Sequence, residues 1–319
     1  MLLLDILLFV ASCALLVVST RVLLNSLVKV ASYLELKEFV VGFMLMAVAT
    51  SLPELFVGII AALEHTPLLS LGNVIGANIM DLTIVIGTVA LLSRGIKARS
   101  EIARKDALYM MLIALFPILL MLDHVLSVID GVILLLAFSI YMIRLFGQRK
   151  EFRKTTDHVS KKSARKSIIW FAFGVIGLLI SAKFVVMFAT AIATEMAVPL
   201  LLIGLVIVAI GTTLPELAFE TKAAMSGHEE MTLGDLFGSL VTNSTLVLGI
   251  VAIINPIEIE NFSLFLVAAG FMFLTLLLFT LFIRSEDGIS WQGGVALILL
   301  YVIFIIIELV LEVGILASG

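Results

Sequence analysis

Long apolar runs, separated by short polar segments, dominate the chain. Ten of them have the roughly 20 residues that a helix needs to cross the hydrocarbon core of a bilayer, near 3–30, 38–63, 69–93, 105–122, 125–147, 167–195, 198–224, 231–254, 261–283 and 289–316. Composition agrees: 62% of the residues are hydrophobic, only 14% are charged, and the mean hydropathy is +1.24. The pattern predicts an all-α polytopic membrane protein with ten transmembrane helices and almost no soluble part.

Basic residues fall on one side of this predicted arrangement. If the ten segments alternate, loops on one face carry 17 of the 20 Lys and Arg residues, and loops on the other face carry none. The stretch 144–166 alone supplies nine of them. By the positive-inside rule this face is cytoplasmic, so we expect a protein of the cell membrane with both termini outside. The connector 148–166 is expected to be a solvated linker that fixes topology, with anionic lipid or a protein partner as the alternative.

The sequence repeats itself after 162 residues. Residues 42–55 (GFMLMAVATSLPEL) match 204–217 (GLVIVAIGTTLPEL) at seven of fourteen positions. The match continues without a gap, with Leu71, Gly72, Gly76, Thr83, Val85 and Gly87 falling on Leu233, Gly234, Gly238, Thr245, Val247 and Gly249. Each copy holds five crossings, an odd number, so the halves 1–147 and 167–319 are predicted to be inverted repeats. That arrangement is typical of secondary transporters.

Both copies combine a proline, hydroxyls and a glutamate inside an apolar helix. Pro53 and Pro215 remove a backbone N–H and crowd the carbonyl one turn earlier. Each proline should interrupt its helix and loosen the carbonyls around Thr50 and Thr212. Two carboxylates follow, at Glu54 and Glu216, together with the hydroxyls of Thr50, Ser51, Thr212 and Thr213. Since hard cations such as Ca²⁺ bind six to eight oxygens and a buried carboxylate costs on the order of 2–3 kcal/mol or more, a cation site is predicted here.

The next helix of each copy carries GNVIGANIMD (72–81) and GDLFGSLVTN (234–243). Glycines at four-residue spacing allow close helix packing. Packing does not account for the polar residues Asn73, Asn78, Asp81, Asp235, Ser239 and Asn243. Asp81 and Asn243 are repeat mates, that is, residues 162 apart, and an inverted pseudo-twofold axis should bring them to opposite sides of one site. Asp81 is therefore the third candidate site carboxylate.

At these residues the sequence resembles the cation/Ca²⁺ exchanger superfamily, and in particular prokaryotic, archaeal-type Na⁺/Ca²⁺ exchangers. The resemblance covers essentially the whole chain, with motifs at 42–90 and 204–252. It implies alternating access by sliding of helices one and six, with three Na⁺ competing against Ca²⁺ for overlapping sites. It also implies that Ca²⁺ binds Glu54, Glu216 and the backbone of Thr50 and Thr212. For Na⁺ it adds the Ala47 and Ala209 carbonyls, Ser51, Thr213 and Ser239, with Asp81 and Asn243 at the middle of the site.

Several residues depart from that family pattern. Asp81 and Asn243 exchange the usual order of Asn and Asp, which keeps the charge count. Ala77 replaces a serine hydroxyl that relatives use for one Na⁺. Two extra acids stand at Asp235, usually Asn, and at Glu220, and they are interpreted either as proton relays or as structural groups. The repeat mates Arg21 and Lys183 would need acidic partners if buried, with Asp235 or Glu220 as candidates, or would snorkel to the interface.

The preferred function is Ca²⁺ export in exchange for Na⁺, with the bilayer and the two ions as partners and no cofactor, nucleic acid or obligatory protein partner expected. A Ca²⁺/H⁺ exchanger of the same fold is the alternative, favoured by Ala77 and the extra acids. A membrane enzyme is disfavoured because the histidines fall at loops or helix ends and no H-E-x-x-H motif is present. A channel or scaffold does not need duplicated broken helices.

Overall fold

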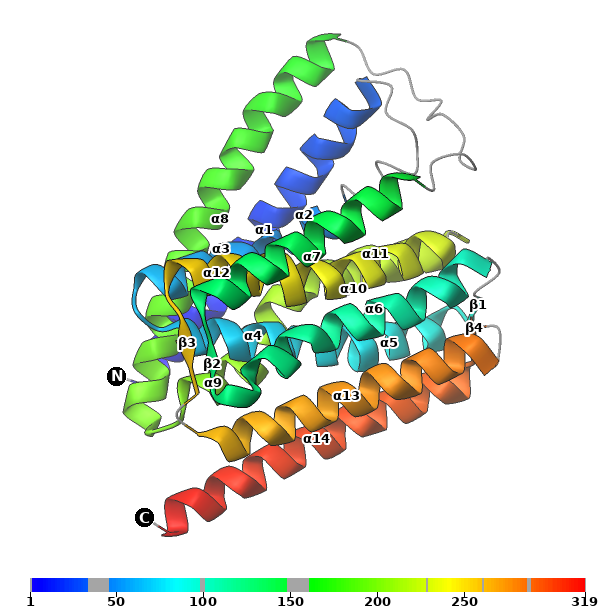
Figure 1. Cartoon of the computed structure of the whole chain (residues 1–319). Helices are drawn as coiled ribbons and strands as arrows, with labels where there is room; N and C mark the ends of the chain where they lie inside the picture. Colours follow the sequence, from blue (N-terminus) through cyan, green and yellow to red (C-terminus); the bar gives the residue numbers. More distant parts are fainter. Residues whose placement is uncertain are drawn as a thin grey trace.

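The chain folds into ten helical units in a computed structural model that describes residues 2–33, 46–97, 101–147, 161–227, 229–259, 261–285 and 288–318 (Figure 1). In chain order the units are α1 (Leu2–Tyr33); α2 (Met46–Thr50) with α3 (Leu52–Leu63); α4 (Pro67–Met80), η2 (Asp81–Val85) and α5 (Ile86–Leu92); α6 (Glu101–Leu120) with η3 (Met121–Asp123); and α7 (Val128–Gly147). The second half consists of α8 (Lys161–Met196); α9 (Leu200–Leu202), η5 (Ile203–Val208) and α10 (Ala209–Met225); α11 (Glu229–Val241), η6 (Thr242–Val247) and α12 (Leu248–Ile254); α13 (Phe262–Ser285); and α14 (Trp291–Ser318).

The predicted all-helical membrane fold is confirmed. Eight of these units are long and apolar enough to cross a bilayer, and two shorter apolar helices lie at Leu52–Leu63 and Ala107–Asp123. The beginning of the predicted second helix, 38–45, lies outside the described residues, as does most of the basic connector. The sixth helix differs from its predicted range 167–195, because α8 already begins at Lys161.

The two halves run in opposite directions, as an inverted repeat requires. α1 and α8 pack antiparallel: the Leu2 backbone N–H donates to Glu195 Oε1 over 3.0 Å at one end of the pair. Further along, Gly177 lies directly against Ser19. Both chain termini lie at the same end of the bundle (Figure 1). We call this the terminal end, and the opposite end, which carries Arg94, Lys97, Lys222 and Arg284, the basic end.

Two short antiparallel strand pairs connect the halves, one at each end of the bundle (Figure 1). At the basic end β1 (Ile96–Lys97) pairs with β4 (Gly288–Ile289). At the terminal end β2 (Val125–Leu126) pairs with β3 (Ile257–Glu258). β1 and β3 occupy nearly equivalent places in the two repeats, and so do β2 and β4. Each pair therefore joins one half to the other. The repeat symmetry thus extends beyond the repeated sequence motifs to the connections between helices.

Only one of the two helix interruptions predicted from the prolines is present. In the first repeat, α2 ends at Thr50 and α3 starts at Leu52, with Ser51 between them and Pro53 in the first turn. In the second repeat the prediction was wrong: α10 continues through Pro215. The irregularity lies upstream, in the π-helix η5 (Ile203–Val208). Pro215 therefore removes one backbone hydrogen bond from α10 without ending the helix.

Glycines place the two halves in direct backbone contact. A Cβ on Gly72 would collide with the Leu201 carbonyl, and one on Gly76 would collide with the carbonyl of Leu205. Reciprocally, a Cβ on Gly204 would meet the Leu69 carbonyl. The predicted packing role of the first GxxxG motif is thereby confirmed, and its partner is the α9 and η5 segment of the other repeat. Backbone atoms cannot move aside cheaply, so only glycine fits at these places.

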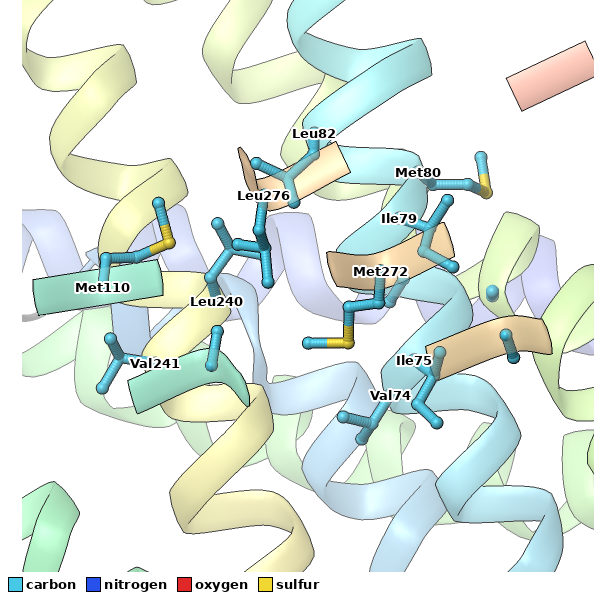
Figure 2. Close-up of a cluster of buried hydrophobic side chains, with 14 of the residues drawn as sticks. Val74, Ile75, Ile79, Met80, Leu82, Met110, Leu240, Val241, Met272 and Leu276 are labelled. Atoms are coloured by element: carbon cyan, nitrogen blue, oxygen red, sulfur yellow. The ribbon is translucent and has the colours of Figure 1, made fainter. Parts of the chain in front are cut away.

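Apolar side chains fix the outer faces of the central helices. Figure 2 shows Val74, Ile75, Ile79 and Leu82 on α4 and η2 together with side chains of α6 and α13, among them Met110, Met272 and Leu276. Leu240 and Val241 of α11 join the same cluster (Figure 2). Since one face of α4 and α11 is held in this way against the surrounding helices, their polar residues are turned inward to the helices that carry the glutamates.

Substituting Gly76 tests the backbone contact. Gly76→Ala places a methyl group against the Leu205 carbonyl and should lower the free energy of unfolding by about 1–3 kcal/mol, as overpacking usually does. The measurement is thermal unfolding of the purified protein in detergent. The matched control is Gly270→Ala, because a Cβ there meets nothing within 4 Å, so it should be neutral or slightly stabilising. Equal melting temperatures for the two variants would contradict the contact.

Candidate functional site

Glu54 and Glu216 are both buried at the centre of the molecule, each with 1% of its surface exposed. Glu54 lies in the first turn of α3, immediately after the helix break. It lies beside Thr212 of the other repeat, whose hydroxyl donates elsewhere. Neither carboxylate has a hydrogen-bond partner, and no Lys or Arg is buried in the described part of the chain. Four carboxylate oxygens are thus buried without a compensating protein cation in the described part of the chain.

Each repeat ties its threonine to the other repeat by a matching hydrogen bond. The Thr212 hydroxyl donates to Asn73 Oδ1 over 2.9 Å. Its repeat mate Thr50 donates to Asp235 Oδ1 over 3.3 Å. All four side chains are buried. These two hydrogen bonds hold the threonine side chains in place. They also fix the backbone beside each glutamate to the opposite half.

The hydroxyl residues that follow these two threonines, Ser51 and Thr213, do not have equivalent partners in the two repeats. Ser51 and Ser239 share a hydrogen bond of 3.1 Å between their Oγ atoms. The equivalent pair in the other half is Thr213 and Ala77, where the second hydroxyl is missing, and Thr213 Oγ1 is buried without a hydrogen-bond partner. The departure at Ala77 that the sequence indicated therefore has a structural consequence: one side of the site has lost an oxygen and left another unsatisfied.

Asp81 and Asn243 stand at the same place in the two repeats, each at the start of a π-helix. η2 begins at Asp81 and η6 at Thr242, so the two π-helices are themselves repeat mates. Asn243 Nδ2 donates to Asn78 Oδ1 over 3.2 Å, and Asn78 Nδ2 donates to Ser244 Oγ over 2.9 Å. Asp81 is 1% exposed and close enough to Glu54 for their charges to interact. π-helical turns often occur at functional sites, and here they carry the site's polar residues.

The remaining predicted ligands lie on the same helices. Ala209 begins α10, and its carbonyl, 3.3 Å from Thr212 Oγ1, is the longer, alternative acceptor for the single hydroxyl hydrogen of that residue. Ala47 belongs to α2. Across the described ranges no three Asp, Glu, His or Cys side chains converge closely enough to form a ready-made metal cluster. A cation here would depend on carboxylates together with hydroxyls and backbone carbonyls, the mixed oxygen set that Na⁺ and Ca²⁺ accept.

Sequence reasoning missed two parts of this network. Ser244 was not singled out, although it bonds Asn78, and the π-helices at Asp81 and Thr242 were not anticipated. A signal was present for Ser244, because Asn78 and Ser244 follow a GxxxG motif in apolar helices where unpaired amides are costly. No comparable signal marks a π-helix, since its extra residue depends on packing between the halves rather than on composition.

Arg21 and Lys183 do not pair with the extra acids. Both side chains are exposed, on α1 and α8, whereas Glu220 and Asp235 are completely buried. The suggested pairing was wrong because these basic residues lie on the outer faces of the two antiparallel helices. Their long side chains instead point away from the core, the arrangement in which Lys and Arg snorkel to the interface.

Comparisons with known proteins agree with this architecture. A family model described as "Sodium/calcium exchanger protein" matches residues 4–147 and again residues 166–310. The chain therefore belongs to the sodium/calcium exchanger family, whose members are cation transporters and not enzymes. The predicted resemblance is confirmed at the level of the family, and the two matches coincide with the two repeats.

Among individual relatives, the uncharacterized membrane protein MJ0091 of Methanocaldococcus jannaschii is 30% identical over 277 residues, 87% of this chain and 89% of its own. The sodium/calcium exchanger MaX1 of Methanosarcina acetivorans is 26% identical, over 87% of this chain and 91% of its own. The solved structure of the sodium-calcium exchanger NCX_Mj superposes with a TM-score of 0.68 at 28% identity, and covers 96% of this chain and 99% of its own.

The Asn78 network can be tested by introducing the residue that the second repeat carries at the equivalent place, Leu240. Asn78→Leu removes two buried hydrogen bonds and leaves Asn243 without its acceptor. Buried unsatisfied amides cost about 1–3 kcal/mol each, so a loss of roughly 2–4 kcal/mol in unfolding free energy is expected in thermal melts. Ser139→Ala, which removes an exposed hydroxyl bonded within its own helix, is the control. Unchanged stability of the Asn78 variant would refute the network.

Proposed function

We propose that this transporter is an antiporter that exports Ca²⁺ from the cell in exchange for Na⁺ entry by alternating access. The observation that carries the proposal is the pair of buried glutamates, one from each inverted repeat, with no hydrogen-bond partner. Unpaired carboxylates in a membrane interior are costly, and bound cations would offset that cost. The family match and the names of MaX1 and NCX_Mj support the choice of Na⁺ and Ca²⁺.

The proposed ligands follow the repeat symmetry. Ca²⁺ binds the carboxylates of Glu54 and Glu216 and the backbone carbonyls of Thr50 and Thr212. Na⁺ ions share part of this oxygen set and additionally use the Ala47 and Ala209 carbonyls, Ser51, Thr213 and Ser239, with Asp81 and Asn243 at the middle of the site. Because the two kinds of ion share ligands, binding of one excludes the other. A relative movement of α1 and α8 against the remaining helices then opens the site to either end in turn.

The proposed orientation places the basic end in the cytoplasm and both termini outside the cell membrane. The distribution of Lys and Arg supports it. The proposed domain division is 1–147 and 167–319 for the two halves, with 148–166 as the linker between them. The last six residues of that linker, 161–166, belong to α8. In the proposed orientation the first helix of the second half therefore extends into the cytoplasm as a basic segment.

The Na⁺ coupling is tested in proteoliposomes loaded with Na⁺ and diluted into Na⁺-free buffer that contains radioactive Ca²⁺. Wild-type protein should accumulate Ca²⁺. Glu54→Gln and Glu216→Gln should reduce uptake to the level of protein-free vesicles, because a neutral amide cannot neutralise the divalent ion. Glu64→Gln, at an exposed glutamate ten residues further along, is the matched control and should transport normally.

Uptake driven equally well by a pH gradient without Na⁺ would contradict the proposal. It would favour a Ca²⁺/H⁺ exchanger of the same fold. The unmatched hydroxyl of Thr213 opposite Ala77 supports that second candidate, because a lost oxygen weakens a Na⁺ site more than a proton acceptor.

Restoring the missing hydroxyl separates these candidates. Ala77→Ser gives Thr213 a partner and adds one oxygen to the site, so the apparent Na⁺ affinity should rise by about two- to tenfold, the range of one net hydrogen bond or ligand contact. The reciprocal variant Ser239→Ala should lower it. The measurement is the Na⁺ dependence of Ca²⁺ uptake. An unchanged Na⁺ dependence in both variants would remove these hydroxyls from the set of ligands.

A further inference from the structure

The two halves differ in buried charge on the two sides of the glutamates. α10 runs toward the basic end, and Glu220 lies one turn beyond Glu216, roughly 6 Å further along the helix. Asp235 lies in the middle of α11, one turn after Thr232, whose hydroxyl donates to the Glu220 carbonyl, so it is also near Glu220. Their repeat mates, toward the terminal end, are Gly58 and Asn73. One side of the site thus carries two additional carboxylates, and the other side carries none at the equivalent places.

These two acids are buried, and three of their four carboxylate oxygens have no hydrogen-bond partner. Both residues have 0% of their surface exposed. Both oxygens of Glu220 and Asp235 Oδ2 lack a hydrogen-bond partner, and Glu220 lies close enough to Asp235 for their charges to interact. The Thr232 hydroxyl, next to Glu220, donates to the backbone carbonyl of that residue over 3.3 Å and not to its carboxylate. In the described part of the chain no basic side chain is buried beside them.

The hydrogen bond to Thr50 does not require a charge on Asp235. In the other half the same bond is accepted by the neutral Asn73, over 2.9 Å. An asparagine at 235 would therefore hold Thr50 equally well, and the negative charge of Asp235 is surplus to that structural task. The remaining oxygens, three from two acids, are the ligand type that hard divalent cations bind.

We infer that Glu220 and Asp235 form a second cation site, which takes Ca²⁺ between the basic end and the central glutamates. Asp235 accepts a hydrogen bond from Thr50 of the central site and is close enough to Glu216 for their charges to interact, so an ion at this second site can move to the central one over a short distance. The inference rests on the transport function proposed above only for the identity of the ion. If the basic end faces the cytoplasm, the site concentrates Ca²⁺ on the side where an exporter meets the lower Ca²⁺ concentration.

The binding test uses the full-length protein in Na⁺-free detergent solution, with Ca²⁺ alone as the probe. In the variant that carries both Glu54→Gln and Glu216→Gln, the central glutamates are neutral. Ca²⁺ should still bind to this variant and raise its melting temperature, since an ion that binds only the folded state stabilises it. Adding Glu220→Gln or Asp235→Asn should abolish that residual shift. Loss of all Ca²⁺ binding in the first double variant would overturn the inference.

Moving one carboxylate from the second repeat to the first by mutation tests the position of the site. Asp235→Asn alone should weaken the apparent Ca²⁺ affinity about tenfold, or ~1.4 kcal/mol, when Ca²⁺ is offered at the basic end, and leave it unchanged at the terminal end. Combining Asp235→Asn with Asn73→Asp keeps the total charge and should strengthen affinity at the terminal end. Gly58 is unsuitable for this purpose, because a Cβ there would lie 2.8 Å from Ser70 Oγ and 3.0 Å from Val251 Cγ2.

The measurement is Ca²⁺ flux in oriented proteoliposomes with the ion supplied from one side at a time. Equal loss of affinity from both sides in Asp235→Asn would refute a second site on one side. The binding test contains no Na⁺, so it stands apart from the proposed coupling. Residual Ca²⁺ binding that depends on Glu220, together with an absence of Na⁺-driven uptake, would leave the second site intact and refute only Na⁺/Ca²⁺ exchange.

Discussion

The free-energy cost of holding carboxylates away from water constrains the whole of this structure. Glu54, Glu216 and Asp81 are buried among apolar helices, where an uncompensated charge is unfavourable by several kcal/mol. In the proposed site, hydroxyl and carbonyl oxygens of the neighbouring helices and a bound cation offset this cost. Glycines bring the helices together, threonines tie the halves across their interface, and π-helices turn amides inward.

Duplication explains the general plan, and departures from symmetry carry the specific chemistry. The hydrogen bonds of Thr50 and Thr212 are equivalent, as are the two π-helices and the two strand pairs. Against that background, three differences are informative: Ala77 opposite Thr213, Asp235 opposite Asn73, and Glu220 opposite Gly58. Two identical halves would present the same site to both sides of the membrane. The substitutions make the sides unequal, which a transporter working in one direction can exploit.

Much of this was predictable from the sequence, for reasons of periodicity and cost. Ten apolar runs predict the helices, an offset of 162 residues predicts the inverted halves, and buried glutamates beside Pro53 and Pro215 mark the centre. Prediction from the sequence failed where the geometry depends on contacts between distant segments. Pro215 was expected to interrupt its helix, but α10 continues through it and the irregular turn lies upstream, in η5. Arg21 and Lys183 were considered as partners for buried acids, because composition alone cannot tell which face of a helix meets lipid.

The backbone contact between α4 and η5 has a consequence for how the chain is made. Gly76 packs on the Leu205 carbonyl, and more than a hundred residues of sequence separate the two. At a synthesis rate of about 5–20 residues per second, the first half spends on the order of ten seconds in the membrane before its partner segment emerges. During that time Glu54 and Asp81 have no second repeat to complete their surroundings. Assembly of the ion site therefore belongs to the last stage of biogenesis, when two separately inserted halves close on each other.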